Sequence, residues 1–386
     1  MRIGIVCHPT IGGSGLIATQ LGIGLARIGY EVHFISHARP FKLVDEKGIF
    51  FHCVEGIDYP LFDDPLYTFA LTAKIVEVAN TYDLDIVHAH YSIPHSLCAY
   101  LASEITHKKF PTVTTIHGTD VTVVGQDKPL YPLNRFSINK STVVTTVSNF
   151  QRRYTKEQFE ISKSIEVIYN FIDLEIFSPK HASLERRRML ASDDEKILMH
   201  ISNFRPVKNT EAVIEAFHMV QAKVNARLVL LGNGPDLNKI KLLCEQLGIA
   251  EKVTFLGDVM HVENIIPNAD CVFQPSYHES FSMVALEAMA CGVPTVTSNA
   301  DGIPEVVEQG KSGFMSEPND ILAMAKDIID VLSDTQLQQR MGAYGRKRAE
   351  QNFCWSDKIA EYVQCYERAI SKRQAKLIEF PKRKQQ

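Results

Sequence analysis

The amino-acid sequence predicts an α/β protein made of two doubly wound domains, each a parallel sheet between helices. At 386 residues the chain is too long for one ordinary domain, since a domain averages about 150 residues. Short apolar segments alternate with amphipathic segments throughout, as is typical of parallel strands buried on both faces. Residues 173–194 interrupt this alternation with a charged stretch, Glu185-Arg-Arg-Arg, and carry no strand pattern. These observations predict two α/β domains joined near residue 173.

Each half of the chain supplies its own series of strands. The intervening and following amphipathic segments predict helices, among them 66–80, 94–106, 209–222, 236–246, 281–289, 321–332, 334–351 and 356–373. The expected strands are residues 3–7, 31–35, 86–90, 112–116, 142–147 and 165–168, then 196–201, 226–231, 253–255, 271–274 and 295–298.

The predicted domains are residues 1–172 and residues 173–355. The last helical segment, 356–376, has an apolar stripe and is expected to pack back on the first domain. Ligands of open α/β sheets bind beyond the carboxyl ends of the strands, so we expect the domains to face each other across a ligand-binding cleft.

Composition indicates a globular protein of the cytoplasm. The chain is 45% hydrophobic and 22% charged, and its net charge of −4 does not indicate a nucleic-acid-binding protein. No apolar run reaches the roughly 18 residues of a membrane span, and no signal peptide is recognised. The eight cysteines are scattered without C-x-x-C spacing, which favours buried thiols. The basic tail from Lys376 onward is expected to be a solvated helix end rather than a lipid contact.

The first loop, HPTIGGSG, matches a dinucleotide fingerprint but does not support that function. Gly13, Gly15 and Ala18 fit G-x-G-x-x-[GA]. A bound dinucleotide needs an acidic residue about 20 residues further on, whereas the second expected strand ends at Ser36 and His37. The glycines, Gly12 included, are therefore expected to bring backbone without Cβ close to a phosphate at a helix N-terminus. A nucleotide-dependent dehydrogenase is the alternative that this loop alone would favour.

The segment HESFSMVALEAMACGVP, which starts at His278, carries the strongest local signal. Glu279 and Glu287 are eight residues apart, which on one helix is a rise of about 12 Å. Paired glycosidase carboxyl groups lie within about 9.5 Å, so these two glutamates are expected to hold separate parts of one elongated ligand. Backbone N–H groups of residues 280–284 would form a phosphate site at the helix N-terminus.

Other polar residues follow predicted strands. Arg205 and Lys208 come after the first strand of the second half, where two cations could neutralise a diphosphate. His117 ends a strand of the first half. His88 and His90, with His95 nearby, suggest zinc, but no acidic or cysteine partner has the required spacing, so we expect no metal site.

Taken together, these motifs resemble the retaining GT-B glycosyltransferases of the family that includes glycogen and sucrose synthases. The resemblance rests on the glycine-rich first loop, the cations after residue 201, a Gly-Asn-Gly-Pro turn, E-x7-E and EAMACGVP. More narrowly, HPTIGGSG, HAHYSIPH, TTIHGTDVTVVGQD, VIYNFID and HISNFRPVKN resemble the branch of this family that joins N-acetylglucosamine to L-malate in bacillithiol biosynthesis. Many members of the family carry Gly-Arg where this chain has Ser202-Asn203, and Arg205 is the expected substitute for that arginine.

The resemblance implies transfer of N-acetylglucosamine from UDP-GlcNAc to the malate hydroxyl with retained configuration, releasing UDP without a metal or other cofactor. It implies that Lys208 and Arg205 bind the diphosphate, Glu287 the ribose, Glu279 the hexose, and His117 the donor sugar near its reacting end. The implied catalytic residues are His117, Glu279, Arg205 and Lys208. The wider set of donor contacts is Gly13, Ser14, Gly15, Asn203, Ser282, Met283 and Val284, the last three through their amides. The expected malate contacts are Ser14, Tyr91, Thr115 and Arg135.

Three alternatives stay open at this point. The first is a related transferase that acts on an inositol phosphate or a lipid, the second is the dehydrogenase, and the third is a non-catalytic sugar-nucleotide-binding protein. A homodimer is the expected assembly. No nucleic-acid partner and no integral membrane segment are expected.

Overall fold

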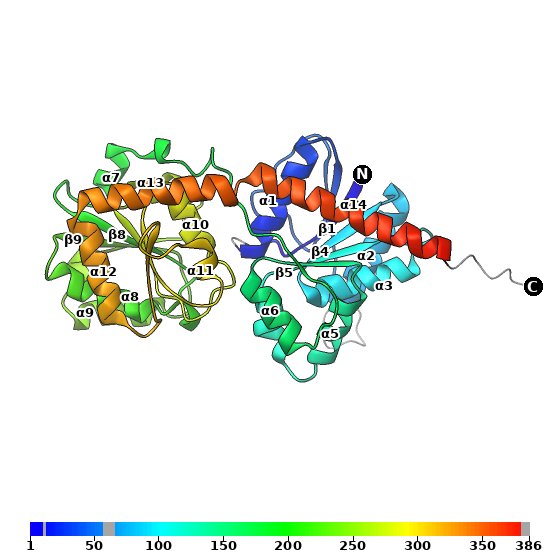
Figure 1. Ribbon diagram of the computed structural model, residues 1–386, viewed down its shortest axis with the longest axis horizontal. Helices are drawn as coiled ribbons and strands as arrows, with labels where there is room; N and C mark the ends of the chain where they lie inside the picture. The colour runs from blue at the N-terminus through cyan, green and yellow to red at the C-terminus, as the bar shows by residue number, and fades with distance from the viewer. Residues whose placement is uncertain (11–12, 57–65, 380–386) are drawn as a thin grey trace, which may run out of the picture. The chain divides into compact units, whose positions relative to one another are not determined.

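The computed structural model describes residues 1–10, 13–56 and 66–379, and the chain divides into two compact units. Unit 1 comprises Met1–Asn170 together with the C-terminal segment from Ser356, and unit 2 is Phe171–Trp355. Each unit is a parallel sheet with helices on both faces (Figure 1). The prediction of an α/β protein with two doubly wound sheets is therefore confirmed.

The sheet of unit 1 has seven strands in the order β3-β2-β1-β4-β5-β6-β7, all paired in parallel. The chain builds outward from β1 to β3, then returns to the other side of β1 and continues to β7. The strands are β1 (Arg2–Val6), β2 (Glu31–Ser36), β3 (Ile49–Cys53), β4 (Ile86–His90), β5 (Thr112–Ile116), β6 (Val143–Thr146) and β7 (Glu166–Val167).

Successive side chains of these strands pack against different helices. Val6, Val87 and Ala89 point to one face and form a core with α2 and α3. On the other face α1 lies very close to the sheet. A Cβ added at Gly22 would come within 2.2 Å of the Phe34 ring, so this position of the helix requires glycine. The helices of unit 1 are α1 (Gly13–Arg27), α2 (Tyr67–Tyr82), α3 (Leu97–Ile105), α4 (Thr119–Thr122), α5 (Tyr131–Lys140), α6 (Asn149–Gln158) and α14 (Trp355–Glu379).

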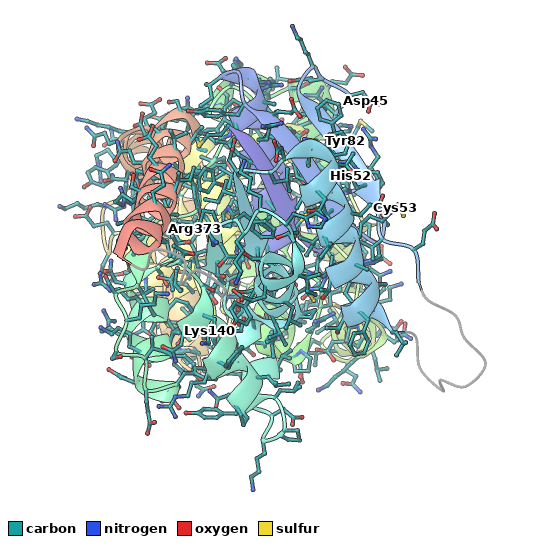
Figure 2. All side chains as sticks on the ribbon, turned by 90° about the vertical axis from the view of Figure 1, so that its right-hand side faces the viewer. Asp45, His52, Cys53, Tyr82, Lys140 and Arg373 are labelled. Atoms are coloured by element: carbon teal, nitrogen blue, oxygen red, sulfur yellow. The ribbon has the colours of Figure 1, made fainter. Side chains whose placement is uncertain are left out.

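The C-terminal helix α14 (red in Figure 1) is fastened to this sheet by buried polar contacts. The Tyr366 hydroxyl lies 2.8 Å from Nδ1 of His88, and both side chains are fully buried. Two turns further along the helix, Arg373 donates to the carbonyl of Phe110 over 3.0 Å; Figure 2 shows this arginine on α14. Helix α14 is therefore part of unit 1, although it comes last in the chain.

The sheet of unit 2 has six parallel strands in the order β10-β9-β8-β11-β12-β13. The chain again builds outward in one direction and then restarts beside its first strand. The strands are β8 (Lys196–Ile201), β9 (Ala226–Leu231), β10 (Val253–Gly257), β11 (Cys271–Gln274), β12 (Thr295–Ser298) and β13 (Gly313–Ser316).

One large apolar core lies between this sheet and the helices α8, α9 and α12. Leu228 and Phe273 of the sheet pack there with Phe217 of α8 and Ile328 of α12. The helices of unit 2 are α7 (Leu184–Leu190), α8 (Thr210–Gln221), α9 (Leu237–Gln246), α10 (Met283–Ala290), α11 (Ile303–Val306), α12 (Ile321–Ser333) and α13 (Thr335–Asn352). Across the described residues, none of the helices combines the length and apolar composition that crossing a membrane requires.

The sequence pattern missed the edge strands β3 and β13. Strand β3 has half-buried and exposed positions rather than a continuous apolar run, and β13 is only four residues long. Helix α3 starts later than expected, since residues Ser92–Ser96 form a π-helical turn before it. A strand at the edge of a sheet is less buried than a central strand, so its sequence needs fewer apolar residues and the strand is harder to recognise.

Each unit buries a histidine in a central strand. Burial lowers the pKa of His88 on β4 to about 3 and that of His200 on β8 to about 4. Nδ1 of His200 lies 2.8 Å from the carbonyl oxygen of Phe273 and therefore donates to it. Both imidazoles are held neutral in the folded protein at neutral pH.

We expect these histidines to make the protein less stable in mild acid. The unfolded chain protonates its imidazoles near pH 6.5, so below that pH it binds more protons than the folded chain and the free energy of unfolding falls. Between pH 7.5 and pH 5.0 each buried imidazole should cost about 2 kcal/mol. Urea denaturation at the two pH values measures the loss.

The matched variant is His200→Asn, whose amide can replace the Nδ1–H donor but does not titrate. Its loss of stability between the two pH values should be smaller than that of the parent by about 2 kcal/mol. An identical pH dependence in the variant and the parent would contradict the assignment.

Candidate active site

The strand order of unit 2 identifies the edge of the sheet where a ligand would bind. The order reverses between β8 and β11, so the loops that follow these two neighbouring strands turn away in opposite directions. Ligands of doubly wound sheets bind at such a reversal, beyond the carboxyl ends of the strands. Lys208 follows β8, and Glu279 follows β11.

The structure brings these two side chains into contact. Nζ of Lys208 lies 2.5 Å from Oε2 of Glu279, and the side chains are 22% and 23% exposed. A half-buried ion pair of this kind presents both a cation and a carboxylate to a ligand. The sequence predicted both residues as site residues but did not predict that they form a pair.

Backbone contacts hold the two loops together. The Tyr277 amide donates to the carbonyl of Val207 over 2.9 Å, which ties the loop after β11 to the loop after β8. Asn209, in the left-handed conformation with φ of 51°, donates from Nδ2 to the carbonyl of Pro275. These bonds place Lys208 beside Glu279.

Asp301 and Gly302 hold the backbone at Glu279. Oδ2 of Asp301 accepts from the Glu279 amide (3.1 Å), and the Gly302 amide donates to the Glu279 carbonyl (2.9 Å). A Cβ at Gly302 would lie 2.1 Å from the Ser280 carbonyl oxygen, so only glycine allows this close approach. Asp301 has φ of 52° and was not among the predicted site residues.

Glu279 does not lie on the same helix as Glu287, so the helical rise of about 12 Å between them does not apply. Helix α10 begins at Met283, after Ser282 adopts φ of 73°, so Glu279 is in the preceding loop. Glu287 lies inside α10 and is only 8% exposed. A rise per residue along a helix therefore does not give the separation of these two carboxylates.

The N-terminus of α10 offers the amides that the sequence predicted for phosphate. The Ser282 hydroxyl accepts from the Ala285 amide (3.4 Å), and the Ser282 carbonyl accepts from Leu286. Within the described ranges, the amides of Ser282, Met283 and Val284 have no acceptor. Free amides at a helix N-terminus attract anions.

The remaining predicted residues of unit 2 lie at the same edge. Arg205 is exposed at the start of the turn Pro206–Lys208, and no carboxylate among the described residues pairs with it. Asn203 is also exposed. A Cβ at Gly234 would lie 1.8 Å from the Asn203 carbonyl oxygen, which explains the glycine in the Gly-Asn-Gly-Pro turn.

In unit 1 the strand order reverses between β1 and β4, and the predicted first loop follows β1. Helix α1 begins at Gly13 with φ of 55°. A Cβ at Gly15 would lie 2.6 Å from the His8 carbonyl oxygen, so this glycine lets the helix start against the loop. Gly12 lies outside the described residues.

Two predicted acceptor residues meet at this edge. The Tyr91 phenol is hydrogen-bonded to Ser14 and Thr119, and burial raises its pKa. The Tyr91 ring stacks at 5.7 Å from the ring of His117, which follows β5. Ser14, Tyr91 and His117 therefore form one polar cluster at the carboxyl edge.

Thr115 and Arg135 are not part of that cluster. Thr115 is fully buried, and its hydroxyl lies 2.7 Å from Nε2 of His88 and 2.7 Å from Oγ1 of Thr145, so it faces the interior. Arg135 is exposed on α5 and pairs with Glu160 over 3.0 Å. The structure places Thr115 in the interior beneath α14, where it is not available to a ligand.

The histidines that suggested zinc have other partners. The ring nitrogens of His88 contact Tyr366 and Thr115, and Nδ1 of His95 donates to a backbone carbonyl. Among the described residues, no group of three or more histidine, cysteine or acidic side chains is arranged to hold a metal ion.

Sequence reasoning missed Asp120, a buried carboxylate that organises this edge. It accepts from the Ser92 amide (3.0 Å) and the Gly118 amide (2.9 Å), and so joins the loops after β4 and β5. Desolvation raises the pKa of this carboxyl group. Its position three residues after His117, in the quoted TTIHGTD, was the available signal.

Comparison with known proteins identifies the family. Residues 11–176 match the family described as Glycosyltransferase Family 4, and residues 183–348 match Glycosyl transferases group 1. The N-acetyl-alpha-D-glucosaminyl L-malate synthase of Bacillus anthracis is 40% identical over 367 residues, which cover 95% of this chain and 96% of that protein. A D-inositol 3-phosphate glycosyltransferase of Mycolicibacterium smegmatis is 28% identical over 394 residues, 93% of this chain and 87% of that protein.

The fold agrees with that of solved structures. The crystal structure of Anabaena HepE in complex with UDP and glucose aligns with a TM-score of 0.80 at 20% identity, covering 95% of this chain and 99% of that one. The two parallel sheets, the two family matches and the relative that aligns over 95% of this chain all indicate the same family. The chain therefore belongs to the group 1 and family 4 glycosyltransferases and has the GT-B fold.

Proposed function

We propose that this enzyme transfers N-acetylglucosamine from UDP-GlcNAc to the hydroxyl of L-malate, the first step of bacillithiol biosynthesis. The observation that carries the proposal is the 40% identity to a malate synthase over 95% of this chain. The inositol phosphate transferases are related at 28% identity or less, so an inositol phosphate acceptor is the less supported alternative.

In the proposed reaction the bond between the anomeric carbon and the β-phosphate oxygen of UDP breaks. A bond from the same carbon to the malate hydroxyl oxygen forms on the same face of the sugar, so the configuration is retained. The proton of that hydroxyl passes to the departing phosphate oxygen, giving UDP and α-linked GlcNAc-malate. No side chain has to act as the base.

Unit 2 supplies the proposed donor contacts. Lys208 and Arg205 neutralise the diphosphate as it gains charge, and the amides of Ser282, Met283 and Val284 add hydrogen bonds. Because Lys208 is paired with Glu279 at 2.5 Å, a diphosphate that draws Lys208 away leaves that carboxylate for the hexose hydroxyls. Glu287 takes the ribose hydroxyls, and Asn203 borders the same site.

Unit 1 supplies the proposed contacts to the reacting end. His117 binds the donor sugar, and Gly13, Ser14 and Gly15 bring backbone to the phosphate. Ser14 and Tyr91 bind malate, supported by their shared hydrogen bond. That Arg135 binds a malate carboxylate stays a prediction, based on the preference of carboxylates for bidentate arginine. To do so, Arg135 would have to break its ion pair with Glu160.

The reaction as proposed needs no metal or other cofactor, because cations and helix amides balance the leaving diphosphate. We also propose that the enzyme works in the cytoplasm, since six of its cysteines are buried and scattered, as in chains kept reduced. A homodimer is proposed on the general prevalence of symmetric pairs.

The first test follows UDP release by the purified protein. With UDP-GlcNAc we expect UDP to appear when L-malate is present and not without it, at the same rate with magnesium or with EDTA. The product should show the α anomer by proton NMR. Equal release with inositol phosphate would overturn the malate acceptor, and loss of activity in EDTA would overturn metal independence.

A second test removes the proposed charge stabilisation. Lys208→Ala should lower kcat about 100-fold, the cost of losing one group that stabilises transition-state charge. The matched control is Lys311→Ala, which breaks an exposed lysine–glutamate pair of 2.6 Å with Glu308 in the same unit. A similar kcat in both variants and the parent would remove Lys208 from the site.

A third test addresses the ribose. Glu287→Gln keeps the shape of a buried side chain but loses its charge, and it should raise the KM for UDP-GlcNAc about tenfold, the effect of weakening hydrogen bonds to a charged group. The KM for malate should stay constant. If both KM values are unchanged, Glu287 does not hold the donor.

A further inference from the structure

Four histidines of unit 1 lie together, and the proposed reaction uses only one of them, His117. A fifth, His8, lies beside His95 with ring centroids 4.3 Å apart. His88 and His90 project from the same face of β4, with ring centroids 4.3 Å apart. Nδ1 of His90 lies 2.9 Å from Nε2 of His117, and Nδ1 of His95 lies 2.5 Å from the His90 carbonyl oxygen. Three of the four are fully buried, and His117 alone is partly exposed.

The contact between His90 and His117 contains one proton, which can belong to either ring. If His117 donates from Nε2, then neutral His90 carries its own proton on Nε2. That nitrogen is buried and has no hydrogen-bond partner among the described residues. If His90 donates from Nδ1 instead, its Nε2 is a bare acceptor.

The second arrangement is the better one physically. Among buried backbone groups, N–H donors without a partner are rarer than under-satisfied acceptors, and the same preference favours leaving Nε2 of His90 as a bare acceptor. Among the described residues, no hydrogen-bond acceptor reaches Nε2 of His90. His95 bonds through Nδ1, and its Nε2 also has no partner in the described part of the chain.

We propose that His90 is a positioning residue that donates from Nδ1 to His117 and thereby fixes His117 as the tautomer with its proton on Nδ1. His117 then offers an N–H, not a lone pair, to the oxygen of a bound sugar. This inference rests on the proposed function for the identity of that sugar, but the tautomer itself is a property of the protein without substrate.

The ring of His90 is held in place by the helix α14. Tyr366 of that helix contacts Nδ1 of His88 at 2.8 Å, and Thr115 contacts Nε2 at 2.7 Å, so the His88 ring is bonded on both sides. His88 in turn packs on the His90 ring. Desolvation lowers the pKa values of His88 and His117 to about 3, so both rings are neutral at pH 7.

The test combines nitrogen-15 NMR of histidine-labelled full-length protein at pH 7 with kinetics. His117 is assigned by the signal lost in His117→Gln, and its shifts show which ring nitrogen is protonated. We expect Nδ1 protonated and Nε2 bare in the parent. In His90→Ala the His117 signals should shift toward a mixture of tautomers, and kcat should fall about tenfold with the KM for UDP-GlcNAc nearly constant.

His90→Asn is the conservative variant, since an asparagine amide nitrogen can occupy the place of Nδ1 and donate. It should restore most of the kcat and the parent tautomer. The control is His52→Asn. His52 lies beside Tyr82 (Figure 2), and its Nε2 is 2.9 Å from His33 Nδ1, a second histidine pair of the same length in unit 1. That variant should change neither readout.

A proton on Nε2 of His117 in the parent would overturn the proposal. So would unchanged His117 signals and kcat in His90→Ala, or an effect of His52→Asn as large as that of His90→Ala. If the parent releases no UDP with malate, the proposed function fails, whereas the NMR result still decides the tautomer.

Discussion

The structure depends on parallel pairing on both sides of one central strand in each sheet. β1 pairs with β2 and β4, and β8 pairs with β9 and β11. Parallel strands must all leave the sheet at the same edge, and the reversal of strand order makes the loops there separate. Each sheet therefore has one place where polar side chains can meet a ligand without disturbing the core. Most of the predicted site residues lie at those two places.

Backbone strain is concentrated near these edges and is offset locally. Asn209, Ser282 and Asp301 all have positive φ, which costs a non-glycine residue about 1–3 kcal/mol. Each also uses its side chain to bond nearby backbone: Asn209 to Pro275, Ser282 to Ala285, and Asp301 to Glu279. Small polar residues suit such positions, because they tolerate the left-handed region and supply a hydrogen bond. Asn209 and Asp301 thereby hold the loops that carry Lys208 and Glu279, while Ser282 caps helix α10.

Some polar residues of unit 1 that are close in sequence to the candidate site are buried in the interior and do not face a ligand. Thr115 and His117 are two residues apart along the chain. Thr115 lies on β5 and is hydrogen-bonded in the interior to His88 and Tyr362. His117 follows the end of β5 and lies at the carboxyl edge of the sheet. Helix α14 completes these interior hydrogen bonds, because Tyr366 bonds to His88 and Tyr362 to Thr115. The C-terminal helix thus supports the strands that carry the site.

The sequence alone determined the class of fold, most strand positions, and the residues of unit 2 that gather at the sheet edge. Apolar runs and helix periodicity are local signals, and a parallel sheet puts every loop that follows a strand at one edge. Only the tertiary structure decided that Lys208 pairs with Glu279, that Thr115 is internal and that Arg135 faces Glu160. It also revealed Asp120 and Asp301, and the contact between His90 and His117. These outcomes depend on positive φ values and on hydrogen bonds between distant segments, and neither leaves a periodic pattern in the sequence.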